Sequence, residues 1–294
     1  MNYTIKNSFY TLTASSMGAE AVSIKNAVGR ELLWQNPWQE GWQRHAPLLF
    51  PFCGRLKDAT YYANGKSYPM TIHGFAPTSE FKLIKATDDT LVFQLEASDA
   101  TRAIYPYDFR LTASYKLLGD EISLSVTVEN TGDEELPFMF GWHPGFVLFT
   151  DEGQDIEDYA VKFKNRHELT RIIAEDNYDI PPLQVKYPTP KSEYKLCESQ
   201  IYECDTMVFC DTGTDVTLEA DGHPYKLEMS YSENLPVLCI WKMARHEAKY
   251  ICIEPWSQAV YRGEDSNVME KRTMTRLAAG KKEDYFYKIR FSFT

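Results

Sequence analysis

The chain has 294 residues, and its 42 Asp plus Glu outnumber its 31 Lys plus Arg, which gives a formal net charge of −11 with the histidines neutral. Hydrophobic residues make up 44% and charged residues 25%, the usual balance of a globular protein with a large core. Nucleic acids and anionic membranes both require a cationic patch, and the sequence has no run rich in Lys or Arg. We therefore expect no nucleic-acid partner and no membrane partner.

The sequence features that report on location point to the cytoplasm. Residues 1–6 contain no charged segment followed by an apolar stretch, so no secretory signal is predicted. The longest charge-free apolar run, residues 136–150, is shorter than the roughly 18 to 20 residues that cross a bilayer. The six cysteines form no C-x-x-C pair, which is typical of reduced thiols rather than of disulfides or a zinc ribbon.

Alternation of apolar and polar residues predicts strands along most of the chain. Residues 109–117 alternate, a turn follows, and alternation resumes over 122–128, which predicts an antiparallel hairpin. A second hairpin is predicted over 216–229, because Asp-Gly at 221–222 is a favoured turn pair. Alternation over 285–293 predicts a last strand at the edge of a sheet.

Other fold classes lack their sequence signatures. No helical period is longer than about three turns, and strands and helices do not alternate as in a parallel α/β sheet. The sequence contains no repeat of fixed period, which argues against a propeller or a solenoid. The sequence predicts an all-β protein, a large antiparallel β-sandwich, in one domain that spans residues 1–294.

Polar residues interrupt apolar segments at several places, and the first is Arg55. It follows an apolar run over 46–53 and then Gly54, so its guanidinium could bind adjacent hydroxyls or a carboxylate. A surface ion pair with an acid is an equally good interpretation.

Two histidines stand in similar surroundings. His73 and His143 each follow apolar residues and precede a glycine or proline turn. A single histidine of this kind is usually a satisfied core residue. Two of them at strand ends favour a site where imidazoles transfer protons.

The apolar segment 250–256 contains a carboxylate. In a strand, Cys252 and Glu254 share one face. Glu254 is either a surface acid or a partly desolvated base, and desolvation would raise its pKa. Trp256 offers a flat apolar surface of the kind that sugar rings prefer. Asp205 enters the next apolar run in a similar way but gives a weaker signal.

Motifs for other chemistries are missing from the sequence. No H-x-H or H-E-x-x-H spacing predicts a metal site, and no G-x-S-x-G, Walker or G-x-G-x-x-G pattern predicts a serine hydrolase or a nucleotide enzyme. Acid–base chemistry by histidines and carboxylates is what the pattern favours, and the family resemblance described next implies that neither a metal nor an organic cofactor is needed.

These segments, taken in order, resemble the aldose 1-epimerase (galactose mutarotase) superfamily. The resemblance is closest to compact bacterial members often encoded with lactose-metabolism genes, and it runs from about residue 34 to the C-terminus. The matching segments are Pro47-Leu48-Leu49-Phe50-Pro51, Gly54-Arg55-Leu56, His73-Gly74-Phe75, His143-Pro144, Asp205 and Cys252-Ile253-Glu254-Pro255-Trp256. The resemblance implies a β-sandwich often called a supersandwich, with a sugar-binding cleft on one sheet.

The resemblance also implies a role for each matched residue. Glu254 would be the general base that takes the proton of the C1 hydroxyl of a pyranose. His143 would be the general acid that protonates the ring oxygen, and His73 would orient the sugar near that oxygen. Arg55 and Asp205 would hold sugar hydroxyls. The expected partner is a small-molecule sugar, and the sequence predicts no particular oligomeric state.

Several alternatives stay open beside a mutarotase of a neutral aldose. Gly74-Phe75 after the first histidine is a form shared with hexose-6-phosphate 1-epimerases, although few basic residues lie near the matched segments, which favours a neutral sugar. A non-catalytic carbohydrate-binding protein would be expected to lose the acid or the base. A glycosidase would use Asp205 and Glu254 as a carboxylate pair roughly 5 to 10 Å apart.

Overall fold

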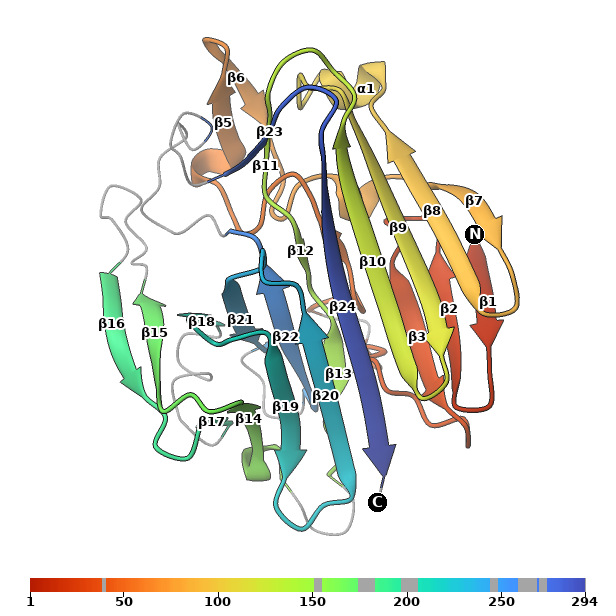
Figure 1. Ribbon diagram of the computed structural model, residues 1–294, viewed down its shortest axis with the longest axis vertical. Helices are drawn as coiled ribbons and strands as arrows, with labels where there is room; N and C mark the ends of the chain where they lie inside the picture. Colours follow the sequence, from red (N-terminus) through yellow and green to blue (C-terminus); the bar gives the residue numbers. More distant parts are fainter. Residues whose placement is uncertain are drawn as a thin grey trace.

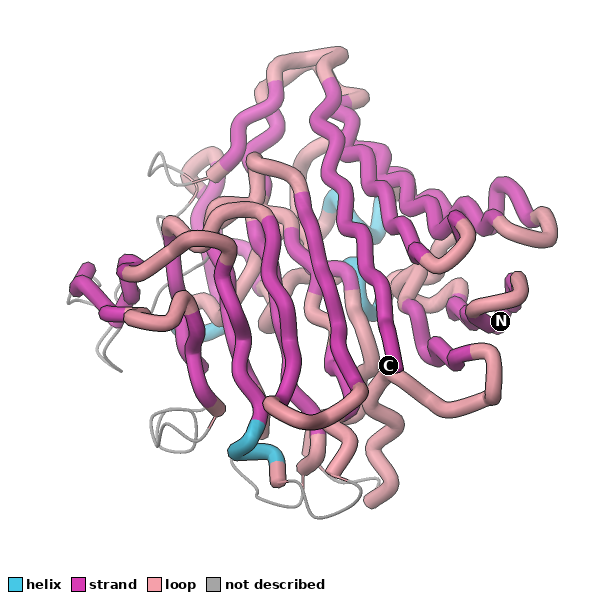
Figure 2. The backbone as a smooth tube through the Cα atoms, turned by 60° about the horizontal axis from the view of Figure 1, so that its bottom comes forward, coloured by secondary structure: helices cyan, strands magenta, loops and turns pink. Residues whose placement is uncertain are grey.

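The computed structural model describes residues 1–38, 41–150, 155–173, 183–196, 206–243, 248–258, 269 and 274–293. Strands dominate these residues, and the helices are short turns (cyan in Figure 2). All strand pairs within the sheets are antiparallel, and the longest strand, β24, runs through the middle of the molecule (Figure 1). The prediction of an all-β antiparallel fold is confirmed.

The first large sheet has nine strands. In spatial order they are β17 (Glu193–Lys195), β14 (Tyr159–Phe163), β19 (Asp215–Ala220), β20 (Tyr225–Tyr231), β24 (Lys282–Phe293), β10 (Glu121–Asn130), β9 (Phe109–Leu118), β8 (Thr90–Glu96) and β7 (Lys82–Ala86). Both predicted hairpins are present, as β9–β10 and β19–β20. The prediction of an edge position for the last strand is wrong, because β24 pairs with both β20 and β10. Alternation reports which side chains are buried, and it carries no information on how many neighbours a strand has.

The second large sheet has eight strands. In spatial order they are β16 (Leu183–Pro188), β15 (Glu168–Ile173), β18 (Thr206–Cys210), β21 (Val237–Trp241), β22 (Tyr250–Trp256), β12 (Gly141–Trp142) and β4 (Leu48–Leu49), and β13 (Gly145–Val147) also pairs with β22. Aromatic contacts join this sheet to the first. Tyr287 of β24 donates a hydrogen bond to the carbonyl of Pro255 at 3.1 Å, and its ring centroid lies 5.2 Å from that of Trp142. The two sheets therefore pack on one another through a large aromatic core.

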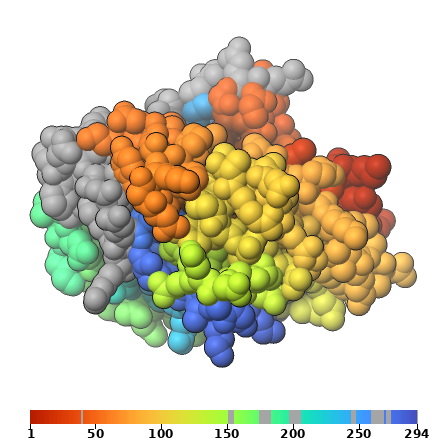
Figure 3. Space-filling model, turned by 90° about the horizontal axis from the view of Figure 1, so that it is seen from above, coloured from red at the N-terminus to blue at the C-terminus, as the bar shows by residue number. Residues whose placement is uncertain are grey.

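Smaller elements complete the chain. They are a three-stranded sheet of β1 (Asn2–Lys6), β2 (Tyr10–Ser15) and β3 (Ala21–Asn26), the pairs β11 (Leu136–Phe138) with β23 (Thr275–Leu277) and β5 (Thr60–Ala63) with β6 (Lys66–Pro69), the helix α1 (Asp99–Arg102), and the 3₁₀ turns η1 (Lys57–Ala59), η2 (Ala76–Thr78) and η4 (Ile156–Asp158). The β5–β6 hairpin (orange) and the region of α1 (yellow) lie side by side at one end of the molecule (Figure 3). In the described ranges, no helix has both the length and the apolar character that a membrane crossing requires.

The strand β22 is the longest described strand in which every residue is buried, with seven residues. Ile251 and Ile253 belong to the main core, whereas Cys252 and Glu254 point to the opposite face, as the two-residue period predicts. A carboxylate on a strand that is buried on both faces must have a specific environment, because an unpaired charge there is costly.

Candidate active site

A cavity of about 660 Å³ opens over one face of the eight-stranded sheet. Its floor is made by alternate residues of β21 and β22, namely Cys239, Trp241, Glu254 and Trp256. Two loop segments form its walls, within residues 42–55 and 71–78. The sheet fixes the floor, and segments distant in sequence close the sides.

The register of three strands brings His143 and Glu254 together. β12 and β13 both pair with β22, through Gly141 and Gly145, and the turn between them carries His143. On this register His143 falls opposite Glu254, and the imidazole Nε2 lies 3.3 Å from the carboxylate Oε2. The structure therefore brings together the two residues that the sequence singled out as acid and base.

Burial opposes charge on both members of this pair. It raises the pKa of the Glu254 carboxyl well above its ordinary value, which agrees with the desolvated alternative of the two that the sequence left open. It lowers the pKa of the His143 imidazole, and the neighbouring His73 lowers it further. Among the described residues, Glu254 Oε2 and His143 Nδ1 have no hydrogen-bond partner. The pair therefore keeps hydrogen-bonding capacity that its described neighbours do not use.

His73 is held in a single tautomer. The backbone N–H of Gly54 donates to His73 Nδ1 at 3.1 Å, so the ring proton belongs on Nε2. Burial, with a smaller effect of the Arg55 charge, lowers the pKa of His73 to about 4. Its ring meets that of His143 edge to face, with centroids 5.3 Å apart. At neutral pH His73 is therefore an uncharged hydrogen-bond donor beside the acid–base pair.

Two positions of the site require glycine because neighbouring atoms lie too close to leave room for a Cβ. A Cβ on Gly74 would lie 2.1 Å from the carbonyl oxygen of Phe50, and its φ of +77° is also unfavourable for other residues. A Cβ on Gly141 would lie 2.3 Å from Cδ1 of Trp256, so the indole rests directly on the backbone. Part of the apolar surface of Trp256 is therefore covered by protein. Its buried Nε1–H lacks a partner among the described residues and is a further donor for a ligand.

Of the two other predicted binding residues, the structure describes one. Arg55 lines the cavity and is exposed. Asp205 lies outside the described residues. Sequence reasoning missed Trp42, which stacks on His143, and Arg171, which lines the cavity from β15. The three tryptophans within residues 34–42 were the available signal for the first.

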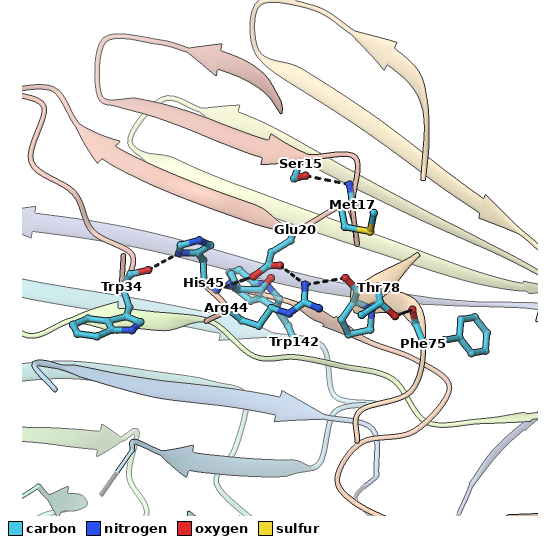
Figure 4. A network of polar contacts seen from close by, with 12 residues as sticks. Ser15, Met17, Glu20, Trp34, Arg44, His45, Phe75, Thr78 and Trp142 are labelled. Atoms are coloured by element: carbon cyan, nitrogen blue, oxygen red, sulfur yellow. Dashed lines mark hydrogen bonds and ion pairs between the residues drawn. The ribbon is translucent and has the colours of Figure 1, made fainter. Parts of the chain in front are cut away.

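A buried carboxylate anchors the wall that carries Trp42. Glu20, only 4% exposed, accepts hydrogen bonds from the backbone N–H groups of His45 at 2.7 Å and Ala46 at 3.0 Å. It also accepts from the Arg44 guanidinium at 3.2 Å (Figure 4). Hydrogen bonds to a charged group are each worth roughly 1.5–3 kcal/mol. The loop is therefore tied firmly to the residue that directly precedes strand β3.

The same pocket contains three potential metal ligands, His143, Cys252 and Glu254, whose donor atoms lie within 4.8 Å of one another. Burial raises the pKa values of the Cys252 thiol and the Glu254 carboxyl, which favours their protonated forms. Metal ions bind the deprotonated forms of both groups. This environment suits proton transfer better than metal binding.

Comparisons with known proteins agree on one family. A family model described as aldose 1-epimerase matches residues 1–264. The protein LacX, chromosomal, from Lactococcus lactis subsp. lactis is 26% identical over 280 residues, covering 92% of this chain and 93% of that protein. A galactose mutarotase related enzyme from Lactobacillus acidophilus superimposes with a TM-score of 0.90 at 31% identity, covering 100% of this chain and 98% of the other. A galactose mutarotase-like protein from Lactobacillus casei has the same fold, with a TM-score of 0.88, 24% identity and coverage of 99% and 100%.

Proposed function

Because the chain belongs to the aldose 1-epimerase family, we propose that it is a mutarotase that interconverts the α and β anomers of a hexose. The observation that supports this most directly is the His143–Glu254 contact inside a cavity of about 660 Å³. That volume lies within the roughly 300–1,000 Å³ of small-molecule sites. One acid and one base, side by side, are what sugar ring opening requires.

In the proposed reaction, Glu254 takes the proton of the C1 hydroxyl while His143 donates a proton to the ring oxygen. The C1–O5 bond breaks, and the products are a C1 aldehyde and a C5 hydroxyl. Rotation about the C1–C2 bond presents the other face of the aldehyde. The ring then closes as both protons return by the reverse steps, so the pair ends in its starting state.

The electrostatics of the site favour this exchange. The reactive form before ring opening is the ionised pair, a carboxylate and an imidazolium, whereas burial in the cavity favours the neutral pair with the proton on Glu254. Proton transfer to Glu254 and from His143 leaves two neutral groups. Burial therefore makes each residue more reactive in its ionised form than it would be in water.

Three further residues are proposed to hold the sugar. His73 donates from Nε2 to an oxygen near the reacting bond, since its Nδ1 is occupied by the Gly54 N–H. Trp256 contributes its Nε1–H, and Arg55 contributes its guanidinium at the exposed part of the cavity. A contact of Asp205 with the sugar stays a prediction from the sequence.

Polarimetry of freshly dissolved α-glucose and α-galactose tests the proposal. We expect the purified protein to accelerate the approach to anomeric equilibrium. Binding of the same sugars by calorimetry without any acceleration would instead identify a carbohydrate-binding protein. Release of nitrophenol from nitrophenyl glycosides would identify a glycosidase, the third alternative.

One observation favours hexose 6-phosphates as a second candidate substrate class. Arg44, Arg55 and Arg171 all line the cavity, where Glu254 is the only acidic lining residue among those described. Arg171 comes from β15, far in sequence from the matched segments. Against this, Arg44 is already paired with the buried Glu20, and the formal net charge of the chain is −11. We therefore propose the neutral hexose first.

A further inference from the structure

The imidazole of His143 is enclosed by aromatic rings. Trp42 stacks on its face, with ring centroids 5.1 Å apart and planes at 27°. His73 and Trp241 approach with interplanar angles of 85° and 72°, at 5.3 and 5.5 Å. Because Nδ1 has no hydrogen-bond partner among the described residues, no such bond orients the ring from that side. The plane of the imidazole is therefore defined by these ring contacts together with the Glu254 contact at Nε2.

Trp42 is itself immobilised on several sides. Its ring stacks on Tyr250 with centroids 5.4 Å apart and planes at 15°, and it meets Trp241 edge to face at 5.5 Å. Gly145 lies beneath it, so closely that a Cβ there would be 2.6 Å from Cζ3 of the indole. The anchoring of residues 44–46 to Glu20 holds the loop on which Trp42 sits. A ring held in this way can impose its orientation on a neighbour.

A hydrogen bond with the backbone of His143 itself raises the pKa of the imidazole, and the neighbouring side chains offer its charged form little further support. Glu254 and Cys252 face it from β22, and His73 faces it from the loop before η2, with Arg55 beyond. Burial raises the pKa values of Glu254 and Cys252 and lowers that of His73, so all three tend to be neutral. The Arg55 charge acts on His73, whose pKa it lowers further. An aromatic face, in contrast, attracts a cation by roughly 0.5 to 2 kcal/mol.

We propose that Trp42 is a positioning residue that fixes the imidazole plane of His143 and stabilises its imidazolium form through the indole face. This inference rests on the proposed function, in which His143 must carry a proton to the ring oxygen. It extends that function by assigning the proton affinity of the acid to a residue about a hundred positions away in sequence.

The test compares Trp42→Leu, which removes the aromatic face, with Trp42→Phe, which retains one. Trp38→Leu is the matched control, because Trp38 contacts Trp34 in the same aromatic cluster and does not line the cavity. NMR titration of the sugar-free proteins follows the His143 ring, assigned with His143→Gln. We expect the pKa of His143 to fall by roughly one unit in Trp42→Leu, equivalent to about 1.4 kcal/mol, and by much less in Trp42→Phe and Trp38→Leu.

Kinetics give a second readout that a mere sugar contact would not produce. Trp42→Leu should lower kcat about tenfold and move the acidic limb of its pH profile to lower pH by the same shift as the titration. A raised KM with unchanged kcat and unchanged His143 titration would overturn the proposal. If no variant and no parent protein accelerates mutarotation, the proposed function fails, and the titration still decides the role of Trp42.

The variant Gly145→Ala provides an independent test of the proposal if the Trp42→Leu protein does not fold. The added methyl group displaces the indole from beneath and leaves every titratable side chain in place. We expect the same direction of shift in the His143 pKa. An unchanged titration in a folded Gly145→Ala protein whose indole fluorescence has changed would contradict the proposal.

Discussion

His143, in the two-residue turn between β12 and β13, faces Glu254 of β22, with Nε2 and Oε2 3.3 Å apart and the two side chains only 8% and 1% exposed. Their spacing follows from the pairing of β12 and β13 with β22, because the hydrogen-bond ladder holds this short turn on both sides. Sites built on strands hold their groups more accurately than sites built on loops. The same pair is also the source of the clearest predictions.

Replacement of Glu254 by Gln should remove most of the acceleration of mutarotation. The amide keeps the shape of the side chain and cannot accept the proton of the C1 hydroxyl, so we expect a loss of roughly 10² to 10⁴ in rate. Sugar affinity should stay within a few-fold. Polarimetry and calorimetry measure the two quantities, and Glu228→Gln on the other sheet is the control. Near-normal activity of Glu254→Gln would show that another group is the base.

The pH profile of kcat/KM should be bell-shaped, because the active pair holds one proton. On the acidic side the pair gains a second proton, and the lowered pKa of His143 moves this limb to low pH. On the alkaline side it loses its last proton, and the raised pKa of Glu254 moves that limb upward. Both limbs belong to the coupled pair, so Glu254→Gln should alter both. A rate that is constant from acidic to alkaline pH would exclude this pair as acid and base.

His73 should make the protein less stable in acid. Its pKa is about 4 in the folded chain and about 6.5 when unfolded, so the unfolded chain binds the extra proton between these values. Stability is therefore fully present above pH 6.5 and is lost as the pH falls toward 4, by about 2 kcal/mol at pH 5. Urea unfolding at pH 7 and pH 5 measures this loss. In His73→Asn, which tolerates the φ of +64°, the loss should be smaller by that amount. Equal losses would mean that His73 titrates normally in the folded chain.

Glucose should be turned over with weak dependence on salt, and glucose 6-phosphate should be poorer by at least about tenfold in kcat/KM, or roughly 1.4 kcal/mol. The reason is the acidic field of the chain together with the pairing of Arg44 to Glu20. Rates at low and high ionic strength, for the parent and for Arg171→Gln, decide between the substrates, with Arg110→Gln as a distant control. Faster turnover of the phosphosugar that weakens with salt and with Arg171→Gln would establish the second candidate.

Local patterns were sufficient to predict much of the fold. The β9–β10 and β19–β20 hairpins followed from alternation and turn residues, which are local properties. The central place of β24 was not predictable in this way, because its neighbours β20 and β10 come from segments about sixty and about one hundred and sixty residues earlier. Pairing over such separations depends on the whole assembly of sheets.

The residues of the candidate site also fall into those that local sequence patterns predict and those that they do not. Glu254 and His143 were visible in the sequence, because a polar residue inside an apolar segment stands out wherever the chain goes. Trp42 and Arg171 were not, since an aromatic or basic residue at a loop or strand end has many uses. Their part in the cavity appears only when distant segments meet around the floor.

The hydrogen bonds of Glu20 to residues 44–46 connect the segment before β3 to the wall of the cavity, so under the proposed function the N-terminal sheet would influence activity from a distance. Random mutagenesis scored by enzyme activity should find damaging substitutions at and around position 20 in proteins that still fold and still keep every proton-transferring group. Substitutions at Glu20 could also be used in directed evolution of sugar preference. Weakening its hydrogen bonds to residues 44–46 would change the shape of the cavity wall and leave His143 and Glu254 unchanged.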